Sequence, residues 1–539
     1  MTRTYILAHD LGTTGNKVTL FDAETGAAVA SVFEAYDTVY PHPTWAEQDP
    51  AHWRRAVIQG TQRVLALASE QIPSRLSAVA RVGPDQGSAA DPGPERPAAF
   101  RPGAIAAVSF SGMMNGALPL GAAGQPLRSA IIWADQRATA EADLLAERCG
   151  ARRVYRVTGN RATPSCTAAK LLWIRRHQPE IYAATHYFLQ AKDYAAFLLT
   201  GVVATDYSDA SNTNLFDLEA RVWAADMVQA AGLDPAKLPP IYASTAVIGR
   251  VTPEAAGETG LLAGTPVVIG GGDGACATVG AGAVAPGDAY TYIGSSAWMA
   301  VVAERPRFDP AMRTFNLAHL DPTLYFPLGA MQAAGGALDW FERLLRGEAD
   351  GRLYDDLAAA AAVVPPGADG LLFLPYLMGE RSPYWDPAAR GAFIGLSMAY
   401  GRPELARAVL EGVALNLRLI LDALQAQGTT ISAMRLIGGG ARLPLWRQIL
   451  ADVLGLPILL PDLLAEATSL GAAVAGGVGV GLYPDFSVAR RFVRVREAED
   501  PDPAAHRCYD DILSVFQEAY RALAPIYGNR LSQVPCRAG

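Results

Sequence analysis

The sequence predicts an α/β protein that is divided into two domains. The chain has 539 residues, which is more than a single hydrophobic core of ordinary size accommodates. Runs of apolar and β-branched residues alternate with segments of helical spacing, as expected for an α/β protein. Two segments, residues 6–22 and 266–282, also share a pattern, because each sets one aspartate beside an apolar run and a glycine-rich turn. Such similarity between distant segments indicates two related halves.

The first of these segments reads ILAHDLGTTGNKVTLFD and is expected to form a β-hairpin around a phosphate-binding turn. Glycine allows close backbone approach, and the hydroxyl and amide groups of the turn can donate to phosphate oxygens. Asp10 would repel that phosphate unless a divalent cation lay between them. A P-loop would need GxxxxGK, then serine or threonine, then a helix, whereas KVTLFD is typical of a second strand. The segment therefore indicates a site for a magnesium nucleotide, with an ordinary hairpin as the alternative.

Composition and charge exclude several classes of partner. The formal charge of −8 argues against nucleic acid and against an anionic membrane, which both select basic faces. The five cysteines are scattered and lack CxxC spacing, so neither a disulfide framework nor a zinc site is expected. The N-terminus meets charge too early for a signal peptide. The segment LGAAVAGGVGVGLY, preceded by Glu466, is expected to be a packed helix rather than a membrane span. We therefore expect a cytoplasmic protein with a small ligand.

Lysine is rare in this chain and occurs only at Lys17, Lys170, Lys192 and Lys237. Lysine is a compact, strongly hydrated point charge, whereas arginine presents a planar fork of donors. In a chain that otherwise uses arginine, the lysine beside the hairpin turn, Lys17, is expected to contact phosphate as a point charge.

Several further segments have clear local patterns. Residues 81–103 are rich in proline, glycine and charge and are expected to form a surface loop. Strands are expected at AIAAVSF, before the turn SGMMNG, and on both sides of the turn in YTYIGSSAWMAVV. Helices are expected at TAAKLLWIRRH, AKDYAAFLLTG and LPLWRQILADVLG. A long helix is expected to bury the core residues Val409, Val413, Leu417, Ile420 and Leu424.

A dinucleotide-binding fold is an alternative explanation for the glycine-rich turns. The segment GGGDGA fits the GxGxxA pattern loosely, whereas GGGARL lacks the third glycine. An NAD-binding protein would leave the Asp10 hairpin unexplained. A nucleotide held between two domains uses all three turns, and it is the interpretation that we favour.

The chain contains, in this order, the motifs DLGTTGNK, SGMMNG, IIWADQRA, TAAKLLW, AKDY, GGGDGACATVGAG, YIGSSAW, LPYLMGERSPYWDPAARG, ARAVLEGVA and LIGGGARLPLWRQILAD. Together they resemble the FGGY family of carbohydrate kinases, and in particular its xylulokinase branch. The resemblance implies two actin-like (ribonuclease H-like) α/β domains with the active site in the interdomain cleft. It implies an N-terminal domain at residues 1–255 with the sugar site and first phosphate loop, a nucleotide-binding C-terminal domain at 256–495, and a terminal helix and tail at 496–539.

The resemblance also implies roles for individual residues. Asp273 matches the general base that takes the proton from the attacking hydroxyl, and Asp10 and Asp273 match the carboxylates that hold Mg²⁺. The residues that match the sugar site are Met114, Asn115, Asp135 and Gly274. The residues that match the nucleotide site are Gly12, Thr13, Thr14, Lys17, Gly294, Ser295, Ser296, Gly335, Asp339, Gly439, Gly440 and Ala441.

The activity implied by the resemblance is that of an ATP-dependent carbohydrate kinase, which transfers the γ-phosphoryl group to a hydroxyl of a ketopentose such as xylulose. Its cofactors would be ATP and Mg²⁺ and its partner a small-molecule sugar or polyol, with no nucleic acid and no membrane; a homodimer stays open. A kinase for a different ketose, polyol or aldonic acid is the alternative. An actin-like ATPase without sugar kinase activity, or a noncatalytic sugar sensor, would share the fold. The presence of both Asp10 and Asp273 argues against the sensor.

The chain departs from the xylulokinase pattern at the expected sugar contacts. The family motif Gly-Gln-Met-His-Gly is replaced by GMMNG at residues 112–116, so Asn115 stands where histidine is usual. The asparagine that usually follows the catalytic aspartate is replaced by Gly274. His9 replaces an apolar residue beside Asp10 and is expected to be buried and satisfied. These differences predict that D-xylulose is a mediocre substrate and that another ketopentose or a linear polyol is preferred.

Overall fold

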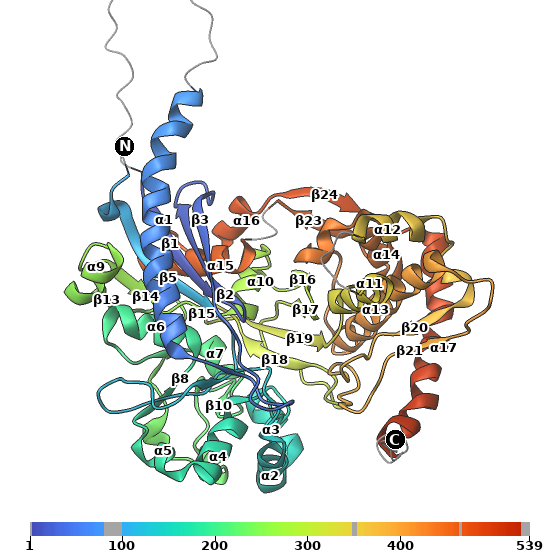
Figure 1. Ribbon diagram of the computed structural model, residues 1–539, viewed down its shortest axis with the longest axis horizontal. Helices are drawn as coiled ribbons and strands as arrows, with labels where there is room; N and C mark the ends of the chain where they lie inside the picture. Colours follow the sequence, from blue (N-terminus) through green and yellow to red (C-terminus); the bar gives the residue numbers. More distant parts are fainter. Residues whose placement is uncertain (1–2, 80–99, 348–352, 463–465, 530–539) are drawn as a thin grey trace, which may run out of the picture. The chain divides into compact units, whose positions relative to one another are not determined.

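The structure is a computed structural model that describes residues 3–79, 100–347, 353–462 and 466–529 (Figure 1). Most of the surface loop expected at residues 81–103 lies outside these ranges. The chain divides into two compact units. The first unit comprises Met1–Val284, Leu317–Leu324 and Glu466–Phe492, and the second comprises Ala285–Asn316, Tyr325–Ala465 and Val493–Gly539.

The first unit is built on a mixed β-sheet. Its strands are β1 (Tyr5–Leu11), β2 (Gly15–Asp22), β3 (Ala28–Ala35), β5 (Ile105–Gly112), β13 (Val247–Arg250), β14 (Pro266–Val268) and β15 (Gly271–Gly272). The helices on this sheet are α1 (Pro50–Val79), α6 (Ala191–Thr200), α10 (Asp273–Gly280) and α15 (Ala467–Gly479), and α9 (Pro253–Thr259) packs on α1 and α6. The strand order is β13-β14-β5-β1-β2-β3, with β15 also paired to β5. α1 packs against β2 and β3, whereas α15 packs against β1 and β5.

Alternation along β1 directs neighbouring side chains to opposite faces of this sheet. His9 is fully buried, stacks on Phe110 with ring centroids 5.4 Å apart, and lies 3.1 Å from the side-chain amide of Asn16. Burial lowers the pKa of His9 to about 3, so its ring is neutral. Asp10, the next residue, instead reaches Thr468 of α15. The prediction of a buried, satisfied histidine is confirmed, and the carboxylate is left on the face that α15 covers.

The remaining elements of the first unit include a second layer of helices and short strands. β4 (Glu47–Gln48) precedes α1, and α16 (Ala489–Phe492) lies at the end of the unit. The layer itself contains β6 (Leu118–Leu120), β7 (Ala130–Ile131), α2 (Thr139–Cys149), α3 (Ala151–Thr158), α4 (Thr167–His177), α5 (Pro179–Ala184), β8 (Tyr187–Leu189), β9 (Thr205–Asp206), α7 (Tyr207–Ser211), β10 (Phe216–Asp217), β11 (Val222–Trp223), α8 (Ala225–Ala230) and β12 (Ile241–Tyr242). A separate hydrophobic cluster, which includes Trp173 and Phe188, holds much of this layer together. α4 and α6 confirm the two helices expected from TAAKLLWIRRH and AKDYAAFLLTG.

The second unit contains another mixed sheet. The strands of this sheet are β16 (Ala289–Ile293), β17 (Ala297–Val301), β18 (Phe315–Ala318), β19 (Tyr325–Met331), β22 (Met434–Ile437), β23 (Ile458–Pro461) and β24 (Val495–Glu499), in the order β18-β19-β17-β16-β22-β23-β24. The last two residues of β18 are counted with the first unit. The other elements of the second unit are α11 (Gly335–Arg346), α12 (Tyr354–Ala362), β20 (Leu372–Leu374), β21 (Ala392–Ile394), α13 (Arg402–Gln425), α14 (Pro444–Leu454) and α17 (Pro503–Asn529). α13 crosses the core of this unit. The five core residues predicted for it are all buried, which confirms that helix.

The first unit extends past residue 255, where the sequence predicts a domain boundary. β14 and β15 pair with β5, and α10 packs against α15, so the chain as far as Val284 belongs to the first unit. The chain also returns to this unit at Glu466–Phe492, which places α15 on β1 and β5. Parallel pairing joins strands that are far apart in the sequence. Local composition therefore does not mark this boundary.

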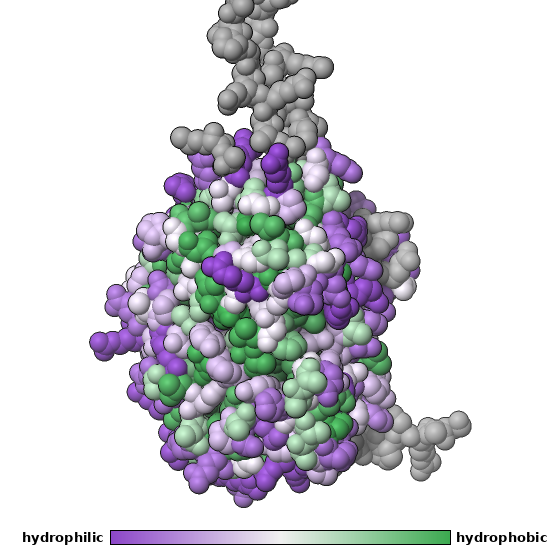
Figure 2. All heavy atoms as spheres, turned by 90° about the vertical axis from the view of Figure 1, so that its left-hand side faces the viewer, coloured by the Kyte–Doolittle hydropathy of each residue, from purple (hydrophilic) through white to green (hydrophobic). Residues whose placement is uncertain are grey.

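On the face shown in Figure 2, hydrophobic residues are visible between hydrophilic ones across the middle of the view. Hydrophobic surface of this kind is common in folded proteins. None of the helices in the described ranges combines the length and the apolarity that crossing a bilayer requires. The late apolar segment forms α15, whose residues Ala467 to Gly477 are almost all buried, in agreement with the packed helix predicted there.

Candidate active site

The segment around Asp10 forms the predicted β-hairpin. β1 and β2 are antiparallel with Asp10 opposite Lys17, and the backbone N–H of Gly12 donates to the carbonyl of Gly15 at 2.9 Å. A Cβ atom on Gly15 would lie 2.6 Å from the backbone carbonyl oxygen of Glu34, so the close approach of β2 and β3 requires glycine there. A strand, rather than a helix, follows the turn, which distinguishes it from a P-loop.

Three side chains from other segments fix the shape of this turn. The hydroxyl of Tyr36 donates to the carbonyl of Gly12 at 2.6 Å, and the side-chain amide of Gln48 donates to the carbonyl of Thr13 at 2.7 Å. The indole of Trp133 donates to the hydroxyl of Thr13 at 2.9 Å. Two of these bonds occupy backbone carbonyl oxygens of the turn, and the third occupies a side-chain hydroxyl. The turn is therefore held in one conformation by residues that its own sequence does not reveal.

Asp10 and Asp273 lie at the same edge of the first sheet, at the carboxyl ends of β1 and β15. β1 and β15 both run parallel to β5 and flank it, with Asp10 aligned to Ser111 and Gly272 aligned to Gly112. Asp273 follows Gly272 as the first residue of α10. The carboxyl ends of parallel strands commonly form binding sites in α/β proteins. The topology thus brings together two carboxylates that the sequence separates by nearly half of the chain.

The electrostatics of this edge favour a proton on Asp273. Burial raises the pKa of Asp273 to about 7, the charge of Asp10 adds to this rise, and the backbone N–H of Gly274 opposes it. That N–H donates to Oδ1 of Asp273 at 2.7 Å and orients the carboxylate. A carboxylate whose pKa lies near neutrality is suited to accept a proton at neutral pH.

Thr468 is a partner of Asp10 that the sequence does not reveal. Its hydroxyl donates to Oδ2 of Asp10 from the first turn of α15. α15 packs closely on α10, since a Cβ atom on Gly471 would lie only 2.0 Å from the carbonyl of Cys276. Glycine at that position allows the two helices to approach, and the approach carries Thr468 to the carboxylate.

The donor set at this edge suits Mg²⁺. The charge of Asp10 contributes to the raised pKa of Asp273, which shows that the two carboxylates repel each other. Mg²⁺ prefers oxygen ligands and is commonly held by one or two carboxylates together with water and substrate phosphates. Within the described ranges, no three or more His, Cys, Asp or Glu side chains gather into a metal cage. The residues therefore fit a magnesium ion that arrives with a nucleotide.

Replacing Asp273 with asparagine is expected to stabilise the fold at alkaline pH. The raised pKa means that the folded state holds a proton on Asp273 more tightly than the unfolded state does, so stability is lost as the pH rises through about 7. Asparagine removes that loss. In EDTA, Asp273→Asn should melt about 2 °C or more above the wild type at pH 8.5. The difference should be clearly smaller at pH 5, because most of the loss falls between that pH and the pKa of the folded state; a difference of equal size at both pH values would contradict a raised pKa.

The SGMMNG turn follows β5 and lies against β15. A Cβ atom on Gly272 would meet the side chain of Met114 at 2.6 Å, so Met114 covers the strand that precedes Asp273. Asn115 has a left-handed backbone with a φ of 64°, and its buried Oδ1 has no hydrogen-bond partner. The backbone carbonyl of Asn115 accepts a hydrogen bond from Nζ of Lys170 at 2.7 Å. The turn therefore holds an unpaired amide oxygen next to the residue that packs on β15.

Lys170 anchors this turn from the fully buried face of α4. Burial lowers the pKa of Lys170 to about 7, and its Nζ donates to the backbone carbonyls of Asn115 and Ser165. Lysine is seldom fully buried, so its residue type gives no reason to expect Lys170 in the interior. The rarity of lysine in this chain was the only feature of the sequence that drew attention to its lysines. That signal indicated Lys17 rather than Lys170.

Asp135 is engaged inside the first unit. It is fully buried and forms an ion pair with Arg137 at 2.7 Å, and its Oδ2 accepts the backbone N–H of Ala46 at 2.6 Å. The backbone N–H of Arg137 donates to Oδ1 at 2.9 Å. The guanidinium of Arg137 lies 3.8 Å from the centroid of the Trp45 ring. Both carboxylate oxygens of Asp135 are thus occupied by protein donors.

In the second unit, the residues predicted to bind the nucleotide gather where β16 and β22 end and where β17 begins. Residues 294–296 form the turn of the predicted β16–β17 hairpin, in which the N–H of Gly294 donates to the carbonyl of Ser296 at 2.9 Å. The first turn of α11 packs on it, because the N–H of Gly335 donates to the carbonyl of Gly294 at 2.8 Å. A Cβ atom on Gly335 would lie 2.5 Å from that same oxygen, so glycine is required there.

The 3₁₀ helix η4 (Gly439–Arg442) follows β22 and packs against the end of β16, next to the turn at residues 294–296. A Cβ atom on Gly440 would lie 2.6 Å from the side chain of Ile293, at the end of β16. Gly439 is exposed whereas Ala441 is fully buried, so the backbone at Gly439 is the accessible part of this segment. Asp339 lies on α11 and accepts a hydrogen bond from a tyrosine hydroxyl of α12. The structure thus brings these predicted residues together within the second unit.

The fold and the site define a class of protein. Two mixed α/β units, each with a glycine-rich hairpin turn, and paired carboxylates at a sheet edge are the features of a two-domain actin-like phosphotransferase. The model for the N-terminal domain of the FGGY family of carbohydrate kinases matches residues 5–83 and 95–280, and the model for its C-terminal domain matches residues 289–480. The chain therefore belongs to the FGGY family of carbohydrate kinases. The break between the two models lies close to Val284, where the first unit gives way to the second.

Individual relatives extend this similarity over nearly the whole chain. The xylulose kinase of Escherichia coli (strain K12) is 35% identical over 517 residues, which cover 96% of this chain and 99% of that protein. The gluconate kinase structure from Lactobacillus acidophilus has a TM-score of 0.85 at 28% identity and covers 98% of this chain and 99% of its own. A ligand-bound xylulose kinase structure from the same organism also has a TM-score of 0.85 at 28% identity, covering 97% and 99%.

Proposed function

We propose that this carbohydrate kinase transfers the γ-phosphoryl group of ATP to a hydroxyl of a ketopentose such as xylulose. The observation that carries the proposal is the pair of carboxylates, Asp10 and Asp273, at one sheet edge, with the pKa of Asp273 raised to about 7. The similarity to a xylulose kinase over 96% of the chain supports this choice of substrate class.

Asp273 is proposed as the general base. Phosphoryl transfer needs a carboxylate that accepts the proton of the attacking hydroxyl as the new oxygen–phosphorus bond forms. With a pKa of about 7, Asp273 is partly ionised at neutral pH and can hold that proton afterwards. The N–H of Gly274 fixes Oδ1, so the carboxylate has a defined orientation. Asp10 is proposed to hold Mg²⁺ together with Asp273, and this ion spreads the negative charge of the phosphates when it is bound.

The glycine-rich turns are proposed to bind the nucleotide. In the first unit, Gly12, Thr13, Thr14 and Lys17 would contact phosphate through backbone amides, hydroxyls and one ammonium group. The turn is already shaped for this by its bonds to Tyr36, Gln48 and Trp133. In the second unit, the proposed nucleotide contacts are Gly294, Ser295, Ser296, Gly335, Asp339, Gly439, Gly440 and Ala441.

The sugar is proposed to bind at the SGMMNG turn beside β15. Asn115 offers an unpaired amide oxygen, which can accept a hydrogen bond from a sugar hydroxyl. Met114 and Gly274 would complete this side of the pocket. Asp135 has both oxygens occupied by Arg137 and backbone, so we propose that it supports the wall of the pocket.

A second substrate class is favoured by a specific comparison. A gluconate kinase structure and a xylulose kinase structure match this chain with the same TM-score of 0.85 and the same identity of 28%. Asn115 and Gly274 also depart from the xylulokinase pattern. An aldonic acid, a different ketose or a polyol is therefore the alternative substrate.

An ADP-release assay over a panel of ketopentoses, linear polyols and aldonic acids tests the proposal. We expect ATP- and Mg²⁺-dependent turnover that requires one of these acceptors. ADP release that is the same with and without every acceptor would instead favour an actin-like ATPase without sugar kinase activity.

We expect Asn115→His combined with Gly274→Asn to shift selectivity toward D-xylulose. An imidazole at residue 115 restores a donor or acceptor that the amide does not place in the same position, and histidine tolerates the left-handed backbone there. A buried hydroxyl left without its partner costs about 1 to 3 kcal/mol, so the ratio of kcat/KM for D-xylulose to that for the preferred substrate should rise about 10-fold. Asn115→Ala is the control, since it removes the amide without adding an imidazole. A wild-type protein that already prefers D-xylulose by a wide margin would contradict this prediction.

A further inference from the structure

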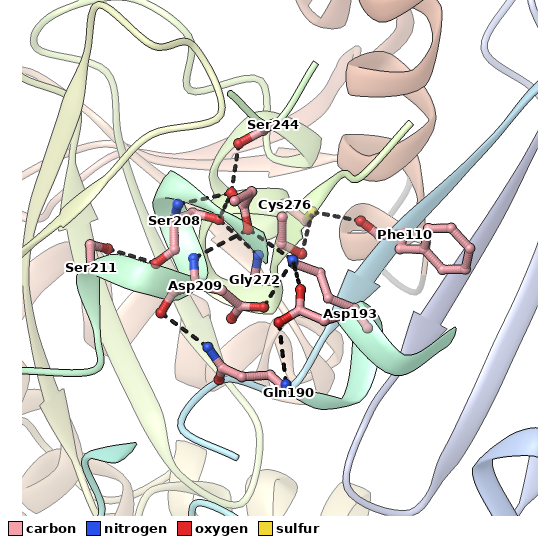
Figure 3. A network of polar contacts seen from close by, with 12 residues as sticks. Phe110, Gln190, Asp193, Ser208, Asp209, Ser211, Ser244, Gly272 and Cys276 are labelled. Carbon is pink, nitrogen blue, oxygen red and sulfur yellow. Dashed lines mark hydrogen bonds and ion pairs between the residues drawn. The ribbon is translucent and has the colours of Figure 1, made fainter. Parts of the chain in front are cut away.

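Four charged side chains lie together in the interior of the first unit, behind the strand that leads to Asp273. Nζ of Lys192 lies 2.6 Å from Asp193, 2.9 Å from Asp206 and 3.1 Å from Asp209. All four residues are at most 1% exposed. Figure 3 shows this network, which joins α6, α7 and β15. Burying charges costs free energy even when they are paired, so the network is an expensive way to fill a core.

Burial and mutual interaction shift the pKa values of Lys192, Asp193 and Asp209. Burial alone would lower the pKa of Lys192, but Asp193, Asp206 and Asp209 together raise it well above its ordinary value. Lys192 therefore remains a cation. Burial raises the pKa of Asp193 and raises that of Asp209 strongly. Lys192 forms ion pairs with all three carboxylates, and its pair with Asp206 is the one that continues to β15.

Asp206 connects this ion pair to the backbone of β15 through one hydroxyl. The hydroxyl of Ser208 donates to Oδ2 of Asp206 at 2.6 Å, and the backbone N–H of Gly272 donates to the same hydroxyl oxygen at 2.9 Å. Ser208 packs closely against β15, and Lys192 packs closely against the end of β5. A Cβ atom on Gly271 would lie 2.7 Å from Oγ of Ser208, and one on Gly112 would lie 2.9 Å from Cβ of Lys192.

The position of Gly272 matters because Asp273 follows it directly. β15 consists only of Gly271 and Gly272, so few backbone hydrogen bonds hold it to β5. Glycine also has the greatest backbone freedom of any residue. A fixed hydrogen bond to the N–H of Gly272 therefore restricts the point from which the Asp273 side chain extends.

We propose that Lys192, Asp206 and Ser208 form a positioning relay that fixes Gly272 and thereby aims the carboxylate of Asp273. None of the three contacts the reacting atoms in this proposal, so they are positioning residues. The inference rests on the proposed function, because it assigns them to the same phosphoryl transfer. A network that only stabilises the core would have no particular effect on the geometry of Asp273.

Two serines provide a matched test of this relay. Ser208 and Ser244 are both buried, and their hydroxyls donate to the same oxygen of Asp206, at 2.6 and 2.7 Å. Only the hydroxyl of Ser208 also accepts the N–H of Gly272. Ser208→Ala and Ser244→Ala therefore remove equivalent bonds from Asp206 and differ in the link to β15. They are preferable to Lys192→Met, which would leave buried carboxylates without their cation and could prevent folding.

Hydrogen exchange measured by mass spectrometry tests, without any substrate, whether Ser208 restrains the backbone at Gly272. We expect faster amide exchange in a peptide covering residues 268–277 of Ser208→Ala than in the wild type, because the N–H of Gly272 loses its acceptor. Exchange of that peptide in Ser244→Ala should match the wild type. Both variants should lose similar amounts of thermal stability.

Steady-state kinetics with ATP and the best acceptor of the panel read the catalytic consequence. Ser208→Ala should lower kcat about 10- to 100-fold with little change in either KM, because the geometry of the base is disturbed while binding is retained. Ser244→Ala should keep kcat within about 3-fold of the wild type.

Equal kcat and equal exchange in the two variants would overturn the relay, even if the wild type is an active kinase. Faster exchange in Ser208→Ala together with unchanged kcat would also overturn it, since the link would then not aim the base. A wild type that phosphorylates no acceptor would defeat the proposed function instead. In that case exchange alone still decides whether Ser208 fixes β15.

Discussion

Asp273→Asn is expected to lower kcat at least about 100-fold, the usual minimum loss when a positioned general base is removed. Asparagine has the same size as aspartate and can still accept the N–H of Gly274, so the first turn of α10 should be preserved. It cannot accept the proton of the attacking hydroxyl. Turnover should be measured at saturating ATP and acceptor, and ATP binding by calorimetry should remain close to that of the wild type.

The pH dependence of kcat separates this role of Asp273 from a structural one. Because the base must be ionised, kcat of the wild type should rise as the pH increases through the pKa of Asp273, and bound Mg²⁺ should move that limb below about 7. Asp273→Asn should lack this limb. Asp321→Asn is a suitable control, because Asp321 is also a turn aspartate of the first unit that accepts a nearby backbone N–H. Near-normal turnover by Asp273→Asn would remove Asp273 from the catalytic role.

Elements whose pattern is local could be predicted from the sequence. The hairpin around residues 12–14 follows from two β-branched runs with a glycine-rich turn between them, and the β16–β17 hairpin follows from the same pattern. α13 is marked by apolar residues at helical spacing, and α14 by apolar residues after a glycine-rich turn. In these elements the hydrophobic period of the sequence matches the geometry of the backbone, so short windows are sufficient.

Contacts between distant segments could not be predicted in this way. Thr468 reaches Asp10 across 458 residues, and it does so only because α15 returns to the first unit and packs on α10. Nothing in the sequence near residue 468 indicates a carboxylate partner. The extent of the first unit to Val284 escaped prediction for the same reason, since it depends on pairing between β5 and strands that follow much later.

The contacts of buried polar residues were the second feature that could not be predicted from the sequence. Lys170 and Lys192 are both fully buried, yet the usual expectation for lysine is exposure, and only three-dimensional contacts show which carbonyls or carboxylates compensate them. Asp135 is a predicted site residue whose protein partners were not expected. Its sugar contact stays a prediction from the motif, whereas its bonds to Arg137 and Ala46 are an arrangement that the motif does not encode.

Asp10→Asn is expected to reduce kcat/KM for ATP about 100-fold or more, and excess Mg²⁺ should restore only part of it. The substitution keeps the size of the side chain but removes the negative charge that makes it a ligand for a hard cation. Activity should be measured against free Mg²⁺ at constant ATP. Thr468→Val should produce a smaller rise in the Mg²⁺ requirement, because it removes the hydroxyl that orients Asp10 but keeps the carboxylate.

Asp22→Asn is the matched control for Asp10→Asn, since Asp22 ends the same hairpin and accepts the backbone N–H groups of Glu24 and Thr25. It should lower stability without changing the Mg²⁺ dependence. Asp10→Asn carries a second signature, because the charge of Asp10 helps to raise the pKa of Asp273. Removing that charge should shift the acidic limb of the residual activity toward lower pH. If the Mg²⁺ requirement of Asp10→Asn equals that of Asp22→Asn, Asp10 does not hold the metal. The shift of the acidic limb would then report only the repulsion between Asp10 and Asp273.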